Sequence, residues 1–205
     1  MMLAKIQDAF KNLDDFYKQI SLLITDTDRI MSENGYAQVN ARVFTGVSRA
    51  VDYPEYWYPT NIYRVYRYPN ESKNTNKCWR FYVDVFLRYK VGNCSDVEYD
   101  ENGTPLIVAG VLKKRDEIKK DFSPESWLHQ YWFWSSEDKE EYENVINPDA
   151  GADGTIKEIY FNTKVDEDVE YLKTFAYPLE EIKDLNTLKN KIIKPVIDLV
   201  PRKVS

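Results

Sequence analysis

The chain has 205 residues, of which 43% are hydrophobic and 30% charged, so it is long enough to bury one core and has the composition of an ordinary globular protein. Its net charge of −6 argues against a general binder of duplex nucleic acid, and its two cysteines are too few for a disulfide framework or a structural zinc site. No run of ~18 apolar residues and no signal-peptide pattern occurs, so we expect a cytoplasmic protein without a membrane span.

Charged and aromatic residues are unevenly distributed along the chain. Residues 36–91 hold nine basic and four acidic side chains (9 − 4 = +5), whereas residues 92–205 hold 15 and 24 (15 − 24 = −9). The sequence also contains 16 Tyr and 5 Trp, which suit either an interface or a core rich in rings. Because the planar guanidinium of arginine fits carboxylates, phosphates and aromatic rings, the basic block is the candidate recognition segment.

The first predicted element is a long helix at about 3–34. Apolar residues recur at alternating steps of three and four from Leu3 to Met31, and Asn34 and Gly35 form a stop signal. The apolar stripe is wider than the seam of a coiled coil, which favours packing across a sheet. A helix that dimerises is the alternative.

A strand-rich core is predicted at about 37–112. Residues 37–47, 62–68 and 79–89 alternate between apolar and polar side chains, and further strands are expected at 97–99 and 105–112. We expect the Ala/Val face of the first strand and the apolar face of strand 79–89 to press on the helix. The apolar face of strand 79–89 consists of Trp79, Phe81, Val83, Val85 and Leu87.

A helical segment is predicted at about 123–145, where Ser123 can act as N-cap with Pro124 in the first helical position. The aromatic run that follows is apolar nearly all round, so it is either buried or half of an interface. The interface candidates are Trp127, Tyr131, Trp132 and Trp134.

One or two strands at about 155–177 and a helix at about 184–199, kinked at Pro195, complete the predicted elements. The order of a helix, hairpin-connected strands and later helices predicts a single α+β domain over residues 1–205. We expect one mostly antiparallel sheet of about five to seven strands, packed against the N-terminal helix.

Asp84 lies in the middle of strand 79–89, on the face opposite the valines, together with Arg80, Tyr82 and Arg88. It can form a structural ion pair with arginines on neighbouring strands, or it can orient those arginines toward an anionic ligand. A third interpretation makes it a metal ligand or base of a nuclease-like site. No second acidic residue follows on the adjacent predicted strand, which weakens this third interpretation.

Other chemical motifs are weak. The only histidine, His129, cannot supply a multi-histidine metal site within one chain. Residues 149–160 match part of a calcium loop, but Gly151 and Tyr160 occupy two ligand positions, so we interpret the segment as a Gly/Asp turn before a strand. Neither the Gly-x-Gly-x-x-Gly motif nor the P-loop motif of nucleotide-binding proteins occurs. We expect no cofactor and no metal site.

The leading hypothesis is a non-enzymatic binding or interaction module that holds an acidic protein, an acidic ligand or a single-stranded nucleic acid on an Arg/Tyr-rich sheet face. The alternatives are a metal-dependent phosphoesterase centred on Asp84 and a structural subunit that dimerises through the N-terminal helix. The candidate ligand-binding residues are Arg42, Arg64, Arg80, Tyr82, Asp84 and Arg88.

Overall fold

The computed structural model describes residues 2–39, 44–45, 61–67, 79–86, 105–115, 153–160 and 169–199. In chain order, the elements of these residues are α1 (Met2–Glu33), β1 (Ala37–Gln38), β2 (Phe44–Thr45), β3 (Asn61–Arg67), β4 (Trp79–Phe86), β5 (Leu106–Lys114), β6 (Lys157–Tyr160), β7 (Val169–Pro178), η3 (Leu179–Glu181), α4 (Leu185–Thr187), η4 (Leu188–Ile193) and α5 (Lys194–Asp198).

The strands form one antiparallel sheet in the order β1-β3-β4-β5-β7-β6, and β2 also pairs with β3. The long helix, the antiparallel sheet and the C-terminal helical segment confirm the predicted α+β class. No helix among these described elements is long and apolar enough to cross a membrane.

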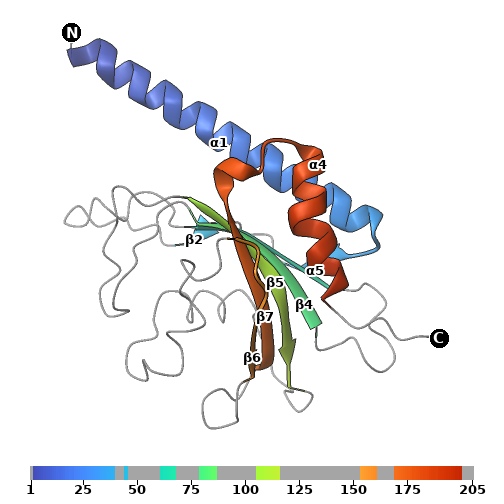
Figure 1. Cartoon of the computed structure of the whole chain (residues 1–205). Coiled ribbons are helices and arrows are strands. Elements are labelled where there is room, and N and C mark those ends of the chain that lie inside the picture. The colour runs from blue at the N-terminus through green and yellow to red at the C-terminus, as the bar shows by residue number, and fades with distance from the viewer. Residues whose placement is uncertain are drawn as a thin grey trace.

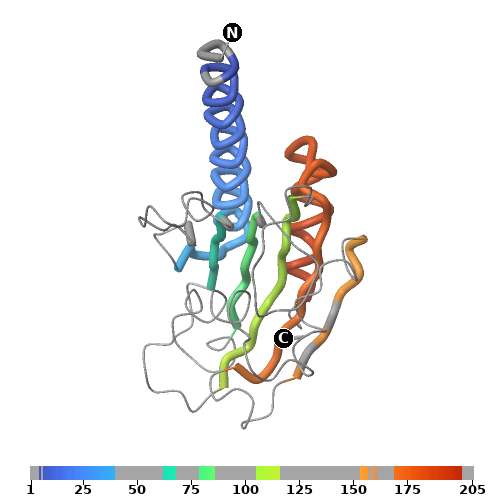
Figure 2. Tube along the Cα trace, turned by 90° about the vertical axis from the view of Figure 1, so that its left-hand side faces the viewer, coloured from blue at the N-terminus to red at the C-terminus, as the bar shows by residue number. Residues whose placement is uncertain are grey.

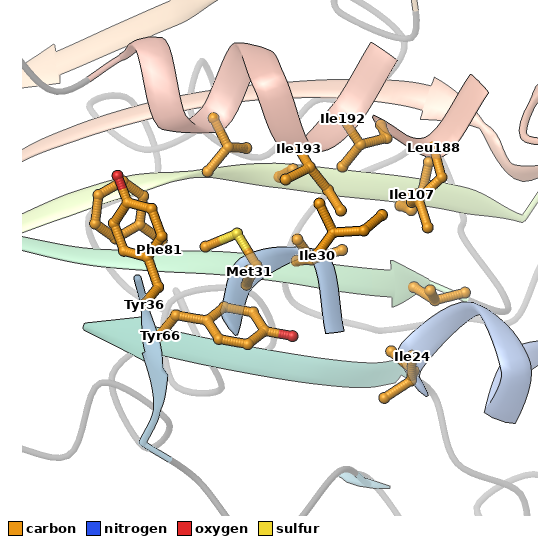
Figure 3. Close-up of a cluster of buried hydrophobic side chains, with 14 of the residues drawn as sticks. Ile24, Ile30, Met31, Tyr36, Tyr66, Phe81, Ile107, Leu188, Ile192 and Ile193 are labelled. Carbon is orange, nitrogen blue, oxygen red and sulfur yellow. The ribbon is translucent and has the colours of Figure 1, made fainter. Parts of the chain in front are cut away.

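The helices lie on one face of the sheet (Figure 1). The C-terminal half of α1 and the helical run from α4 to α5 cover the apolar sides of β3, β4, β5 and β7, as the sequence pattern predicts for β4. Figure 3 shows side chains of both helical segments and of the strands meeting in one layer. The labelled members of this core are Ile24, Ile30, Met31, Tyr36, Tyr66, Phe81, Ile107, Leu188, Ile192 and Ile193.

The turn after α1 decides which side of β1 faces the helices. Gly35 adopts φ +84°, which favours glycine, and the Tyr36 ring then packs on Phe81 with centroids 4.5 Å apart. Because neighbouring residues of a strand alternate, Ala37 points away from the core, and Gln38 pairs with the core residue Tyr66. The expectation that the Ala/Val face of residues 37–47 presses on the helix is therefore wrong for β1.

The C-terminal helix changes its winding just before Pro195. Residues of η4 form a π-helix, whose wider turn is accommodated where a proline supplies no N–H and its ring crowds the preceding turn. Asp184 caps the start of this helical run, because its side chain accepts a hydrogen bond from the Thr187 N–H at 2.7 Å. The predicted helix at about 184–199 is confirmed, with a π-helical insertion in place of a simple kink.

Several predicted features lie outside the described residues. These are the strand at 97–99, the helical segment at 123–145 with its four aromatic interface candidates, His129, both cysteines, Arg42 and Arg88. The single-domain organisation of residues 1–205 stays a prediction.

Candidate functional site

The face of the sheet opposite the helices carries a buried polar cluster. Tyr82 of β4 pairs with Gly110 of β5, and Gly110 pairs with Thr174 of β7, so these three residues form one row across the sheet. Asp84 lies two residues further along β4 on the same face. The side chains are almost inaccessible, with exposed fractions of 0% for Tyr82, 1% for Asp84 and 4% for Thr174.

Gly110 leaves room for the Tyr82 side chain. A Cβ at position 110 would lie 2.7 Å from Tyr82 Oη and would overlap the Lys173 carbonyl oxygen. Burial raises the pKa of the Tyr82 hydroxyl, and the negative charge of Asp84 raises it further, whereas the neighbouring Thr174 hydroxyl opposes the shift. The Tyr82 hydroxyl is therefore neutral throughout the physiological range.

The alternation of strand 79–89 correctly predicts that Arg80, Tyr82 and Asp84 share a face, but that face is not open to solvent at Tyr82 and Asp84. Arg80 is half-buried, and its Nη1 donates to the Trp79 carbonyl oxygen at 2.9 Å. The cluster is thus an internal part of the fold. Ligand binding by these residues stays a prediction.

Arg64 does not join Tyr82 and Asp84. It lies between Ile62 and Tyr66 on β3, whose side chains belong to the helix-covered core, so alternation turns Arg64 toward α1. Its Nε donates to Asp28 Oδ2 at 3.2 Å. Arg64 therefore belongs to the helix–sheet contact, and its expected place beside the other recognition residues is a wrong prediction.

Sequence reasoning missed Asp28, which connects α1 to the sheet. Its carboxylate accepts hydrogen bonds from Arg64 Nε and, at 2.6 Å, from the Tyr66 hydroxyl. Burial raises the pKa of Tyr66, and the hydrogen bond to Asp28 raises it further. One signal in the sequence could have identified Asp28. It lies four residues after Ile24, next to the apolar stripe, where a carboxylate can reach a strand beneath the helix.

A row of three aromatic side chains, Trp79, Tyr171 and Tyr160, crosses one end of the sheet. Tyr171 of β7 contacts Trp79 at a centroid distance of 6.0 Å and Tyr160 of β6 at 4.5 Å, and Tyr160 is 74% exposed. The two lysines beside this row are neutralised: Lys113 pairs with Glu170 at 2.8 Å and Lys173 with Glu158 at 2.6 Å. The row therefore offers little net positive charge to a nucleic acid.

The N-terminal half of α1 is exposed. Figures 1 and 2 both show that α1 continues past the sheet, away from the other helices. None of the described side chains at residues 5–19 is buried, and the first buried residue of the helix is Ile20. We call residues 5–19 the projecting segment.

An apolar stripe runs along the projecting segment toward the core. Phe10 is 68% exposed, Leu13 is half-buried, and Phe16 and Tyr17 are partly buried where they meet the core. These four residues, which we call the α1 stripe, continue the same side of the helix that buries Ile20 and Ile24 under the C-terminal half. The stripe therefore extends an apolar packing surface beyond the sheet that it packs against.

No three His, Cys, Asp or Glu side chains among the described residues lie close enough to share a metal ion.

The described part of segment 149–160 begins with a turn at Asp153 and Gly154. Asp153 Oδ1 accepts a hydrogen bond from the Thr155 N–H at 2.9 Å, and Gly154 has φ +83°. This turn leads into β6 and confirms the interpretation as a Gly/Asp turn before a strand.

The described elements thus define an α+β protein with one antiparallel sheet, a buried polar cluster and a projecting amphipathic helix. Comparison with known proteins gives no match, since no family model fits the sequence and neither a curated protein nor a solved structure is significantly similar to it.

Proposed function

We propose that this chain is a non-enzymatic interaction module that docks an apolar helix of its partner on the α1 stripe. The observation that carries the proposal is the 68% exposure of Phe10 on a stripe that continues directly into the core. An apolar side chain gains about 1.5–3 kcal/mol when it is fully removed from water, so several such residues on one helix face favour association.

The length of the projecting segment supports the same conclusion. Phe16 and Tyr17 pack on the core, whereas residues 5–15 have no sheet beneath them, so this length of helix lacks the tertiary packing that supplies most helical stability in proteins. A partner helix lying along the stripe would supply the packing that the C-terminal half of α1 obtains from the sheet. Docking and helix stability are thereby coupled.

Recognition of an acidic partner on the Arg/Tyr-rich face stays a prediction with less support, because Tyr82 and Asp84 are buried. The same burial disfavours the metal-dependent phosphoesterase, since a substrate and a hydrated ion must reach the carboxylate. We keep the cytoplasm as the proposed location, in which Cys78 and Cys94 would remain thiols.

Photocrosslinking tests the docking proposal in the cells that produce the protein. A benzophenone amino acid replaces Phe10 in one variant and Asp15, on the other side of the helix, in a control variant. Crosslinked products from position 10 but not from position 15 support docking on the stripe. An equal yield of products from both positions, or no product from position 10, overturns the proposal.

A further inference from the structure

We infer that the partner helix is α1 of a second copy of this chain, bound in antiparallel orientation. This inference rests on the proposed function and adds the identity and the direction of the occupant. Three features of the projecting segment carry it: the spacing of its stripe, its balance of charge and its position outside the body of the fold.

The spacing of the stripe allows it to pack against itself. Phe10, Leu13 and Tyr17 follow at steps of three and four, the average of 3.5 that brings successive residues onto one seam of a helix pair. In an antiparallel pair, Phe10 of one copy lies opposite Leu13 of the other, and two-fold symmetry repeats the contact. Phe16 widens the seam on one side of each helix. A large ring therefore meets a smaller aliphatic side chain at each of the two central layers.

The charges of the segment do not oppose self-association. Three lysines and three aspartates occupy residues 5–19, so the segment is neutral although the whole chain carries −6. Lys18 also pairs with Asp14 within its own helix. A partner of strongly positive or negative charge would find no complementary field on this segment, whereas an identical segment carries no net charge that would repel it.

The projection of α1 selects the antiparallel orientation. Fifteen helical residues span about 22 Å, so an antiparallel pair overlapping along the segment holds the two sheet-bearing bodies at opposite ends. That separation exceeds the screening length of about 8–10 Å at moderate salt, which limits repulsion between two bodies that each carry the full charge of −6. A parallel pair would place these bodies side by side.

The expected interface is small. Large aromatic side chains bury about 150–250 Å² each when fully covered, and each copy supplies most of Phe10 and the exposed parts of Leu13, Phe16 and Tyr17. The total is on the order of 1,000 Å², at the lower end of specific interfaces, so we expect a dimer that forms reversibly in the micromolar range.

Sedimentation equilibrium of the purified 205-residue chain measures the association. From about 1 to 200 μM, a range that brackets micromolar affinities, the weight-average mass should rise from 24.2 kDa toward twice that value. Leu13→Glu should hold the mass at one chain throughout this range. Leu22→Glu is the matched control, because Leu22 is 59% exposed on the same helix but lies roughly two and a half turns from Leu13, on the far side.

Two other results overturn the inference. A wild-type chain that stays monomeric at every concentration excludes the second copy as occupant, and so does a dimer that Leu22→Glu disrupts as strongly as Leu13→Glu. Circular dichroism and the melting temperature of each variant separate loss of association from loss of folding. A monomeric wild type whose position 10 crosslinks to a different protein would leave the interaction module intact and remove only the self-association.

Spin labels decide the orientation. In a background with Cys78→Ser and Cys94→Ser, one sample mixes chains labelled at Lys5→Cys with chains labelled at Lys18→Cys. An antiparallel pair brings these two labels close together across the interface, and it separates two Lys5 labels by about 20 Å along the helix axis. The reverse pattern of distances would indicate a parallel pair and would contradict the proposed geometry.

Discussion

The Asp28 carboxylate accepts a hydrogen bond from the Tyr66 hydroxyl at 2.6 Å and so ties the C-terminal half of α1 to β3. Arg64 Nε donates to the other oxygen of the same carboxylate at 3.2 Å. One acidic residue thus satisfies two polar groups at the boundary between helix and sheet, while Ile24 and Ile30 bury apolar surface on either side of it. This contact fixes how α1 lies on the sheet, and hence in which direction its N-terminal half projects.

Removal of the Asp28 carboxylate should destabilise the fold. Asp28→Ala leaves the hydroxyl of the buried Tyr66 and the Arg64 guanidinium without this acceptor, and we expect a loss of about 2 kcal/mol in the free energy of unfolding. Asp28→Asn keeps an acceptor oxygen for Tyr66 and should cost about half as much. Urea denaturation measures both values.

An exposed aspartate of the same helix provides the control for this prediction. Asp14 pairs with Lys18 at the surface, so Asp14→Ala should change the free energy of unfolding by less than about 0.5 kcal/mol. A cost for Asp28→Ala as small as that for Asp14→Ala would show that the contact with Tyr66 and Arg64 contributes little to the attachment of α1.

Two buried tyrosines should make the protein sensitive to alkali. Burial raises the pKa of both Tyr66 and Tyr82 above the usual value of about 10, so both hydroxyls stay neutral in the folded chain when tyrosines of the unfolded chain ionise. Their contribution is fully present below about pH 10 and decreases as the pH rises further, by about 1.4 kcal/mol per pH unit for each tyrosine.

Phenylalanine variants isolate these contributions. Tyr66→Phe and Tyr82→Phe should each make the fall of the urea midpoint above about pH 10 shallower, because one buried ionisable group has been removed. Tyr160→Phe removes a hydroxyl that is 74% exposed and should leave the slope unchanged. Equal slopes for all three variants and the wild type would contradict the assignment of the alkaline sensitivity to Tyr66 and Tyr82.

Periodicity predicts which residues share a face but not what covers that face. The spacing along α1 and the alternation in β3 and β4 predict the helix, the strands and the side of β4 that meets the helix, because burial of a continuous stripe or face dominates the local choice. The burial of Asp84 could not be predicted, since alternation along β4 does not indicate whether the face opposite the helices is exposed. Alternation also leaves open which face of the sheet Arg64 lies on. That face is decided only by the observation that Ile62 and Tyr66 belong to the helix-covered core.

Of the two interpretations of the N-terminal helix, packing across the sheet holds for its C-terminal half, and dimerisation stays a proposal for its N-terminal half. The pattern from Leu3 to Met31 is uniform along the sequence, so it cannot indicate where the supporting sheet ends. The structure shows that packing on the core begins near Phe16, and that Phe10 lies beyond it. A helix that packs across a sheet with one half is left with an apolar stripe on the other half, and the proposed dimerisation concerns that half.

Gly110 should not tolerate a larger residue. In Gly110→Ala the new methyl group would overlap the Lys173 carbonyl oxygen and lie 2.7 Å from Tyr82 Oη, so we expect a loss of about 3 kcal/mol. A double variant with Tyr82→Phe should recover little of this loss, because the clash with the backbone oxygen remains. Full recovery in the double variant would instead identify the tyrosine hydroxyl as the limiting contact.

Gly35→Ala separates lack of space from backbone strain. No atom lies within 4 Å of a Cβ built at this position, but Gly35 has φ +84°, which costs a residue with a Cβ about 1–2 kcal/mol. We therefore expect Gly35→Ala to be less destabilising than Gly110→Ala in the same urea titration. Similar losses for the two variants would mean that the sheet relaxes around an added methyl group at position 110.

The double variant Arg80→Ala with Arg88→Ala tests the sequence-derived recognition face. Because Arg80 is half-buried and its neighbours Tyr82 and Asp84 are buried, we expect this variant to lose stability, with a fall in the melting temperature of roughly 2–4 °C for each 1 kcal/mol lost. Retention on immobilised polyglutamate or on a single-stranded oligonucleotide should be as weak for the wild type as for the variant. If the melting temperature is unchanged and the wild type alone is retained, then this face binds acidic partners despite the burial of Asp84.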